Sequence, residues 1–150
     1  MQLDRDVIVV DASGLILGRM ASFVAKKLLE GYRVWVVNCE KAVISGRSDV
    51  TFEDYLARLH RKDRASPLKG SFATRRPDRI VWRAIRGMVP RDQYRGREAL
   101  RKLKVFIGTP KHLEDVEKVD GSKLPKSSAR RLSGKYVTVE EVARRLGWNP

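Results

Sequence analysis

This sequence of 150 residues has little of what disulfide or metal stabilisation requires. It holds a single cysteine, Cys39, so no disulfide can form within the chain. The two histidines, His60 and His112, lie far apart, and their spacing relative to Cys39 does not match a zinc site. The sequence therefore predicts no metal and no cofactor. A chain of this length can bury a hydrophobic core without either.

Long apolar runs are also missing. No uncharged apolar stretch approaches the roughly 20 residues that a membrane helix needs. The first residues, MQLDRDVIVVDASG, carry acids before a short apolar run, which is not the pattern of a secretory signal. Hydrophobic residues still make up 42% of the chain, enough for a folded core. We expect a soluble, cytoplasmic protein that folds as a single domain over residues 1–150.

Acidic residues are scarce, and their scarcity is local. The chain has 32 Lys and Arg against 18 Asp and Glu, a formal net charge of +14. Residues 58–104 alone hold 16 basic and four acidic side chains, whereas residues 1–57 carry a net charge of −1. Twelve of those 16 cations are Arg, whose planar fork can grip phosphate with two hydrogen bonds. This concentration predicts a surface that binds a polyanion, with nucleic acid favoured over an anionic membrane.

The N-terminal third shows the clearest structural pattern. Residues 7–10 form a β-branched run typical of a buried strand, and apolar residues then recur at helical spacing between Leu17 and Leu28. Gly31 is a plausible helix stop, and residues 33–38 (RVWVVN) form a second apolar strand. Strand, helix and strand with tight links predict a right-handed βαβ unit within a parallel sheet.

The remaining chain alternates between patterned and unpatterned stretches. Pro77 favours a helix start, and a capping box over residues 138–141 predicts a C-terminal helix that ends near Gly147, with a hydrophobic staple of Val137 and Val142. The other expected elements are a helix over 51–59, an extended basic loop over 60–76, a turn-rich basic loop over 87–97, a short helix over 98–103, a strand over 105–107 and a partly ordered connection over 111–135.

The helix expected after Pro77 carries the strongest functional signal. Arg79, Arg83 and Arg86 fall at i, i+4 and i+7 and would line one face beside Trp82. Glycines interleave with the cations, which lets the chain approach a phosphate backbone closely. Because no base-reading motif is present, the pattern favours recognition of RNA shape and phosphate over recognition of sequence.

Enzyme chemistry finds weaker support. A strand followed by the turn 14–18 invites a nucleotide-binding α/β enzyme, but the turn matches neither G-x-G-x-x-G nor a phosphate loop. Asp11 follows a strand, where it can cap a turn as readily as act in catalysis, and Cys39 has no histidine near it in the sequence. A nucleotide-binding enzyme therefore remains an alternative, as does a free-standing RNA or DNA chaperone, while the sequence favours a protein without catalysis.

Several stretches also resemble a known family, the universal large-subunit ribosomal protein thirteen family in its archaeal and eukaryotic form. They occur in the family's order over about two thirds of the chain: VVDASGLILGRMAS (9–22), VVNCEKAVISG (36–46), RRPDR (75–79), RGMVP (86–90) and GREALRKLKVFIG (96–108). Residues 111–150 are expected to form a C-terminal extension. Its last part, from Tyr136 onward, is similar to the C-terminal extension of the archaeal branch. The chain departs from bacterial members at residues 60–70 and 109–115, so bacterial contacts in those loops are not transferred.

The resemblance implies a three-layer α/β/α fold with a small, mostly parallel sheet, basic loop extensions and a C-terminal helix. It further implies a structural, non-enzymatic protein of the cytoplasmic large ribosomal subunit that contacts large-subunit rRNA and neighbouring ribosomal proteins and acts early in assembly. The positions carried over from the family as RNA contacts are Arg19, Lys41, Arg47, Arg75, Arg76, Arg79, Arg86, Arg97, Lys102 and Lys104. Those expected from charge alone are Arg58, Arg61, Lys62, Arg64, Lys69, Arg83, Arg91, Arg95 and Arg101.

Overall fold

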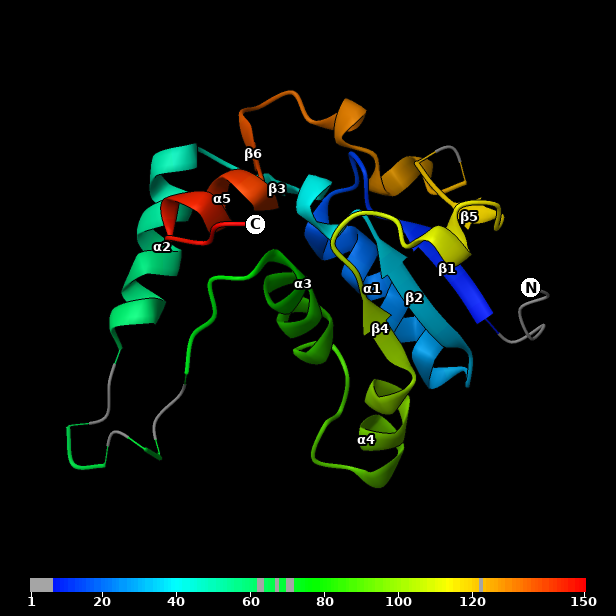
Figure 1. The fold of residues 1–150 in the computed structure, drawn as a ribbon, viewed down its shortest axis with the longest axis horizontal. Coiled ribbons are helices and arrows are strands. Elements are labelled where there is room, and N and C mark those ends of the chain that lie inside the picture. Colours follow the sequence, from blue (N-terminus) through cyan, green and yellow to red (C-terminus); the bar gives the residue numbers. More distant parts are fainter. Residues whose placement is uncertain (1–6, 62–63, 67, 70–71, 122) are drawn as a thin grey trace.

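A computed structural model describes residues 7–61, 64–66, 68–69, 72–121 and 123–150 (Figure 1). Within these ranges the chain forms both helices and strands. Their bounds are β1 Val7–Asp11, α1 Leu17–Leu29, β2 Arg33–Val37, β3 Val43–Ser45, α2 Ser48–His60, α3 Pro77–Arg86, α4 Tyr94–Arg101, β4 Leu103–Val105, β5 Lys118–Val119, β6 Tyr136–Thr138 and α5 Val139–Arg145.

A parallel sheet in the order β4-β2-β1-β5 forms the centre of the fold. β1 pairs with β2 in parallel, with Val9 opposite Trp35, and α1 connects the two strands. The βαβ unit expected from the sequence is therefore confirmed. Gly31 lies beyond the end of α1 with φ at +105°, a conformation that glycine adopts without the steric cost a Cβ would bring.

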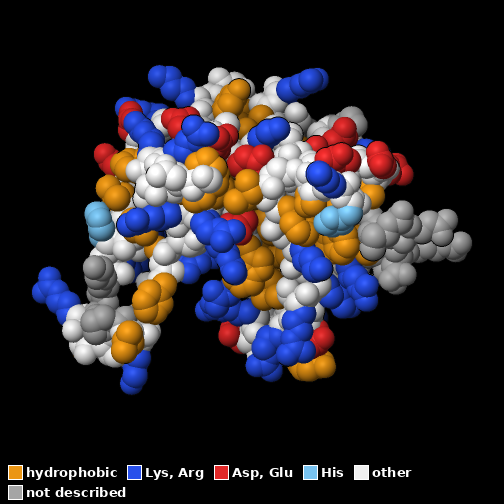
Figure 2. Space-filling model, in the orientation of Figure 1, with side chains coloured by type: hydrophobic (Ala, Val, Ile, Leu, Met, Phe, Trp, Pro, Cys, Tyr) orange, Lys and Arg blue, Asp and Glu red, His pale blue; other side chains and the backbone are white. Residues whose placement is uncertain are grey.

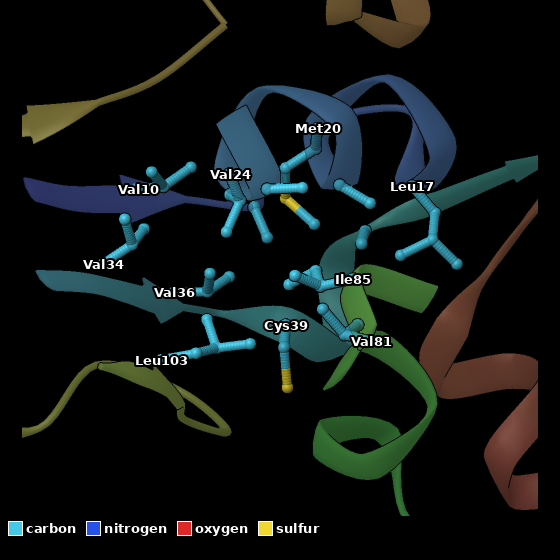
Figure 3. Close-up of a cluster of buried hydrophobic side chains, with 14 of the residues drawn as sticks. Val10, Leu17, Met20, Val24, Val34, Val36, Cys39, Val81, Ile85 and Leu103 are labelled. Atoms are coloured by element: carbon cyan, nitrogen blue, oxygen red, sulfur yellow. The ribbon is translucent and has the colours of Figure 1, made fainter. Parts of the chain in front are cut away.

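One face of this sheet packs against α1, α3 and α4. Val34 and Val36 of β2 point toward Met20 and Val24 of α1, and Ile85 of α3 closes the cluster from the side (Figure 3). All five side chains are fully buried. Val34 and Val36 lie on the same face because alternate residues of a strand point to the same side of a sheet. This cluster is the main hydrophobic core, and it holds α3 in place on the body of the protein.

The opposite face of the sheet packs against a segment with little regular structure. Val9 and Val37 lie there with Leu113, and Trp35 contacts Phe106 edge-on with ring centroids 6.4 Å apart. The segment that covers this face contains a single 3-10 turn at residues 111–113. The α/β class with a mostly parallel sheet is confirmed, and an irregular segment covers the face opposite α1.

The path of the chain explains this arrangement. From β1 through β2 to β4, each new strand is added on the same side of the sheet. The next strand, β5, is added on the other side of β1, so the chain crosses the sheet in the opposite direction between β4 and β5. Since crossovers between parallel strands are right-handed, a reversed direction places the connection on the other face. The connection from β4 to β5 accordingly contributes Leu113 to the cluster opposite α1.

A smaller unit of β3, β6, α2 and α5 adjoins the main sheet. β3 and β6 pair antiparallel, and Val137, Val142 and Leu146 form a cluster with Phe52 of α2. The side chain of Thr138 accepts a hydrogen bond of 3.2 Å from the Glu141 backbone, which confirms the predicted helix start. The packing of Val137 with Val142 is confirmed as well, so this unit anchors the start of the basic loop that follows α2.

Three element predictions near residue 100 are wrong in position. The expected loop over 87–97 ends at Gln93, because α4 begins at Tyr94, and the expected helix over 98–103 is the second half of α4. The expected strand over 105–107 is β4 at Leu103–Val105. β4 is an edge strand in which Leu103 and Val105 face the core and Lys104 faces outward, so its pattern alternates and is not a continuous apolar run.

Three strands, β3, β5 and β6, escaped the sequence patterns. β5 has two residues and lies within the stretch 111–135, which was expected to be only partly ordered. β6 precedes α5 directly, where the sequence indicated only a helix start. β5 and β6 are too short to show a period of two. They form because β1 and β3 each have an edge with which they can pair. Among the described residues, no helix is long and apolar enough to cross a membrane.

Candidate nucleic-acid interface

Helix α3 carries the arginine stripe predicted from the sequence. Pro77 occupies its first position, and Ile80, Val81 and Ile85 bury one face against the core. The spacing of 3.6 residues per turn then turns Arg79 and Arg83 to the exposed side. Arg86 is half-buried, and its guanidinium carbon lies 5.7 Å from the centre of the Trp82 ring. This stacking holds a cation at the edge of the stripe.

The basic loop after α2 lies beside this stripe. Arg83 donates a hydrogen bond to the backbone oxygen of Phe72, which ties the end of the loop to α3. A recess of about 180 Å³ between loop and helix is lined by residues that include Arg83, Arg58 and Tyr55. The Arg58 guanidinium lies 5.1 Å from the Tyr55 ring centre, and burial raises the pKa of the Tyr55 hydroxyl. The end of the loop at residues 72–74 therefore lies directly against α3.

Most of the other predicted cations of this loop lie among the described residues. Arg61, Arg64, Lys69 and Arg75 are exposed. No described residue between 61 and 76 belongs to a helix or strand, in agreement with the expected loop. Lys62, also predicted as an RNA contact, lies outside the described residues.

A second recess lies beyond the C-terminal end of α3. It has a volume of about 480 Å³ and is lined by Arg83, Arg86 and Arg91 together with the turn 87–90 and Asp92. Figure 2 shows Lys and Arg side chains gathered over α3, α4 and the projecting loop, with the surface hollowed between the loop and α4. A concave surface lined by guanidinium groups complements the negative charge of a phosphate backbone.

Helix α4 and strand β4 supply the remaining cations of the basic segment. Arg95 and Arg97 are exposed on α4, and Arg95 donates a hydrogen bond of 2.9 Å to the Gln93 side chain. Lys102 donates to the Gly31 backbone oxygen at 3.1 Å, so it faces the end of α1. Lys104 projects from the opposite face of the sheet, with its Nζ 5.1 Å from the Trp35 ring centre. The cations of 94–104 thus point in several directions.

The three predicted contacts outside the basic segment also lie apart from one another. Lys41 ends the 3-10 turn after β2, and Arg47 precedes α2; both are exposed. Arg19 lies on the first turn of α1 and donates a hydrogen bond of 2.5 Å to the Lys126 backbone oxygen. The side chain of Arg19 therefore faces the segment around residue 126 and not the arginine stripe of α3.

Few of the predicted cations are neutralised by the protein itself. Within the described ranges, carboxylates pair with only three of them, at 3.0 Å for Arg76 with Asp78, 3.9 Å for Arg91 with Asp92 and 2.6 Å for Arg101 with Glu98. All three pairs are solvent-exposed in part and join residues close in sequence, so each is worth about 1 kcal/mol or less and can be exchanged for a contact with phosphate. The charge of the segment remains available to a polyanion.

The groups considered for catalysis have structural roles. Asp11 Oδ1 accepts hydrogen bonds from the Ser13 backbone at 2.9 Å and from the Asn38 side chain at 3.1 Å, which caps the turn after β1. Cys39 is fully buried in the main core (Figure 3). Among the described residues, no group of three or more His, Cys, Asp or Glu side chains is placed to hold a metal ion. The geometry assembles no nucleophile with a base.

The buried thiol gives a direct test of this packing. Burial raises the pKa of Cys39 well above its ordinary value of 9.0, and the neighbouring Glu40 carboxylate raises it further. Because the thiolate is the reactive form, we expect Ellman's reagent to label native protein at pH 8 at least a hundredfold more slowly than protein unfolded in guanidinium. Equal labelling rates in the two states would contradict the buried position.

These observations define a class of protein: an α/β core that displays an exposed, arginine-lined basic surface and assembles no catalytic centre in the described residues. Comparison with known proteins narrows the class. Residues 5–112 match the family model described as Ribosomal protein L13. The chain belongs to the ribosomal protein L13 family.

Its relatives include archaeal proteins named large ribosomal subunit protein uL13. That of Archaeoglobus fulgidus is 47% identical over 148 residues, covering 97% of this chain and 91% of the relative. That of Methanococcoides burtonii is 45% identical over 141 residues, covering 93% and 96%. That of Saccharolobus solfataricus is 44% identical over 149 residues, covering 99% and 97%. The archaeal-type resemblance seen in the sequence is confirmed.

Proposed function

We infer that this chain is a structural constituent of the large ribosomal subunit, located in the ribosome in the cytoplasm and without enzymatic activity. It binds large-subunit rRNA and neighbouring ribosomal proteins and contributes to subunit assembly. The relatives that carry the name of a large-subunit protein span nearly the whole chain, so the proposal applies to its full length.

The basic surface over α3 is the proposed RNA contact. The observation that carries this assignment is the exposure of Arg79 and Arg83 on a helix whose other face is packed into the core, with no carboxylate of the described residues paired to either. A rigid mount reduces the entropy lost when these side chains engage phosphate. The loop over 61–76 and the turn at 87–93 extend the same surface on either side, so the segment can neutralise phosphates where RNA helices pack closely.

Native fractionation of cells that make the protein tests this function. We expect the chain to sediment with large ribosomal subunits and to remain there when subunits are separated at low magnesium. A free-standing RNA chaperone would instead stay in the light fractions of the gradient. Recovery of most of the protein in those light fractions would contradict the ribosomal assignment.

Salt dependence tests the phosphate contacts. Each neutralised phosphate releases a counterion, so contact with about eight phosphates predicts that log K for RNA falls with log salt at a slope of about −6 to −7. Binding of the purified chain to a large-subunit rRNA fragment, measured between 50 and 300 mM potassium chloride, gives this slope. A slope near −2 would show that the segment makes few phosphate contacts.

A further inference from the structure

A second candidate site lies at the carboxyl edge of the sheet, outside the basic segment. A cavity of about 1010 Å³ is lined by Asp11, Ser13 and Gly14 after β1, by Asp120 and Gly121 after β5, and by residues 128–132 and Tyr136. β1 and β5 are parallel neighbours, and β5 lies on the opposite side of β1 from the strands that precede it in the chain, so the strand order reverses between β1 and β5. In open α/β sheets, ligands bind in the crevice beyond the carboxyl ends of the strands at such a point.

The wall of this cavity is built from a second basic stretch. Residues 121–137 hold five Lys and Arg and no acidic residue. The backbone at residues 127 and 129 is bonded to the segment that precedes α1: Ile16 N–H donates to the Ser127 oxygen at 2.7 Å, and Ala129 N–H donates to the Gly14 oxygen at 2.9 Å. Ser127 itself is buried. These hydrogen bonds therefore fix the position of this side of the cavity.

The cavity presents groups suited to a phosphate. Arg130 and Arg131 both line it and are exposed, and among the described residues neither side chain forms an ion pair or a hydrogen bond. The start of α1 is already occupied by the stretch around residue 127, to which Arg19 also donates. A phosphate here would consequently be held by the two guanidinium groups and not by backbone amides of a glycine-rich loop.

The cavity also presents groups suited to a ribose and a base. Asp11 Oδ1 is engaged by Ser13 and Asn38, whereas among the described residues Oδ2 has no hydrogen-bond partner and can accept from a ribose hydroxyl. The second acid at the cavity, Asp120, accepts from the Lys123 backbone at 3.3 Å. The Tyr136 ring is 54% exposed at the rim, where a base could stack on it.

We propose that this cavity binds a nucleoside phosphate, with Arg130 and Arg131 on the phosphate, Asp11 on the ribose and Tyr136 beside the base. The source of that group is a single unstacked nucleotide of the RNA. The cavity would then give the chain a second RNA contact, outside the basic segment 58–104. The choice of RNA over a free nucleotide rests on the proposed function; the site itself does not.

Backbone amide shifts in the intact chain test the proposal. The protein carries Arg79→Glu, Arg83→Glu and Arg86→Glu, which silences the α3 surface, and the probes are adenosine 5′-monophosphate and hexa-adenylate RNA. We expect saturable shifts at Ser13, Gly14 and Gly121. Adding Arg130→Gln and Arg131→Gln should weaken binding at least tenfold, because two charge-assisted contacts are lost. The matched pair Arg144→Gln and Arg145→Gln, with the same change in charge, should weaken it less than twofold.

The outcomes separate the possibilities. Tighter binding of hexa-adenylate than of the mononucleotide supports an RNA nucleotide as the ligand, whereas binding of the mononucleotide alone supports a free nucleotide. No shift at the three amides with either probe, or shifts that persist unchanged without Arg130 and Arg131, would overturn the site. Either negative result leaves sedimentation with large subunits unaffected, so failure of the cavity and failure of the ribosomal function are distinguishable.

Discussion

Replacing Arg79, Arg83 and Arg86 together by Glu should remove the chain from large ribosomal subunits. The three guanidinium groups line one side of α3, and a hydrogen bond to a charged group is worth about 1.5–3 kcal/mol. Losing three such contacts costs about 4 kcal/mol or more, roughly a thousandfold in affinity, before the added repulsion between carboxylates and phosphates is counted. The measurement is the fraction of tagged protein that co-sediments with large subunits.

The fold should survive this change, because none of the three side chains contributes to the core and Glu is a good helix former. A matched control reverses three exposed cations outside the predicted set: Lys26→Glu, Lys111→Glu and Arg144→Glu. It carries the same net charge and should retain most of its co-sedimentation. Wild-type incorporation of the α3 variant would contradict the interface, and equal loss in both variants would show that net charge alone matters.

Replacing Gly96 by Ala should destabilise the protein by about 2 kcal/mol. A Cβ at this position of α4 would lie 2.0 Å from the Pro90 backbone oxygen and 2.5 Å from its carbonyl carbon. Backbone atoms cannot rotate away as a flexible side chain can, so α4 and the turn 87–93 must separate. Overpacking of this kind costs about 1–3 kcal/mol, which outweighs the better helix propensity of Ala. For a chain of this length the melting temperature should fall by roughly 6 °C.

Gly18 provides the opposite case. It lies in α1, is exposed, and a Cβ there meets no atom within 4 Å. Gly18→Ala should therefore stabilise the protein by about 0.5–1 kcal/mol through helix propensity alone. Thermal unfolding of the two variants side by side measures both effects. If Gly96→Ala proved as stabilising as Gly18→Ala, the close approach of α4 to Pro90 would be wrong.

The Gly96 contact also matters for RNA. It seats the first turn of α4 against the turn 87–93, and that turn brings Arg91 to the recess beside Arg83 and Arg86. We expect Gly96→Ala to weaken incorporation as well as stability. The sequence offered no sign of this role, because a glycine within a basic stretch is equally typical of a flexible loop. Only the distance to Pro90 distinguishes the two.

Periodicity predicted the parts of the fold that bury a long apolar face. The stripe from Leu17 to Leu28 and the run at residues 33–38 indicated α1 and β2 correctly, because a buried helix or central strand must repeat its apolar residues over many positions. Pro77 and the capping box at Thr138 placed two helix starts for equally local reasons. Strands of two or three residues, β5 and β6, were missed because their pairing depends on edges supplied by distant parts of the chain.

The candidate interface divides in the same way. Counting charges was enough to find the segment 58–104, and helical spacing was enough to align Arg79, Arg83 and Arg86. Counting could not show that Lys104 and Arg19 face away from that stripe, toward Trp35 and Lys126. Counting also missed Arg130 and Arg131, because acidic residues on either side of 121–137 lower the net charge of that part of the chain. The two arginines line a cavity only because β1 and β5 end at the same edge of the sheet.

The amino-acid sequence by itself determined the class of fold, the central βαβ unit and the excess of arginine that calls for a polyanionic partner, since composition and short-range period are properties of consecutive residues. The tertiary structure decided which cations share a surface, which glycine admits no side chain and which strand ends meet at a cavity. These features depend on how the backbone folds back on itself, both over a short distance, as where Gly96 meets Pro90, and over a long one, as where Gly14 bonds to Ala129, and no periodic pattern encodes them.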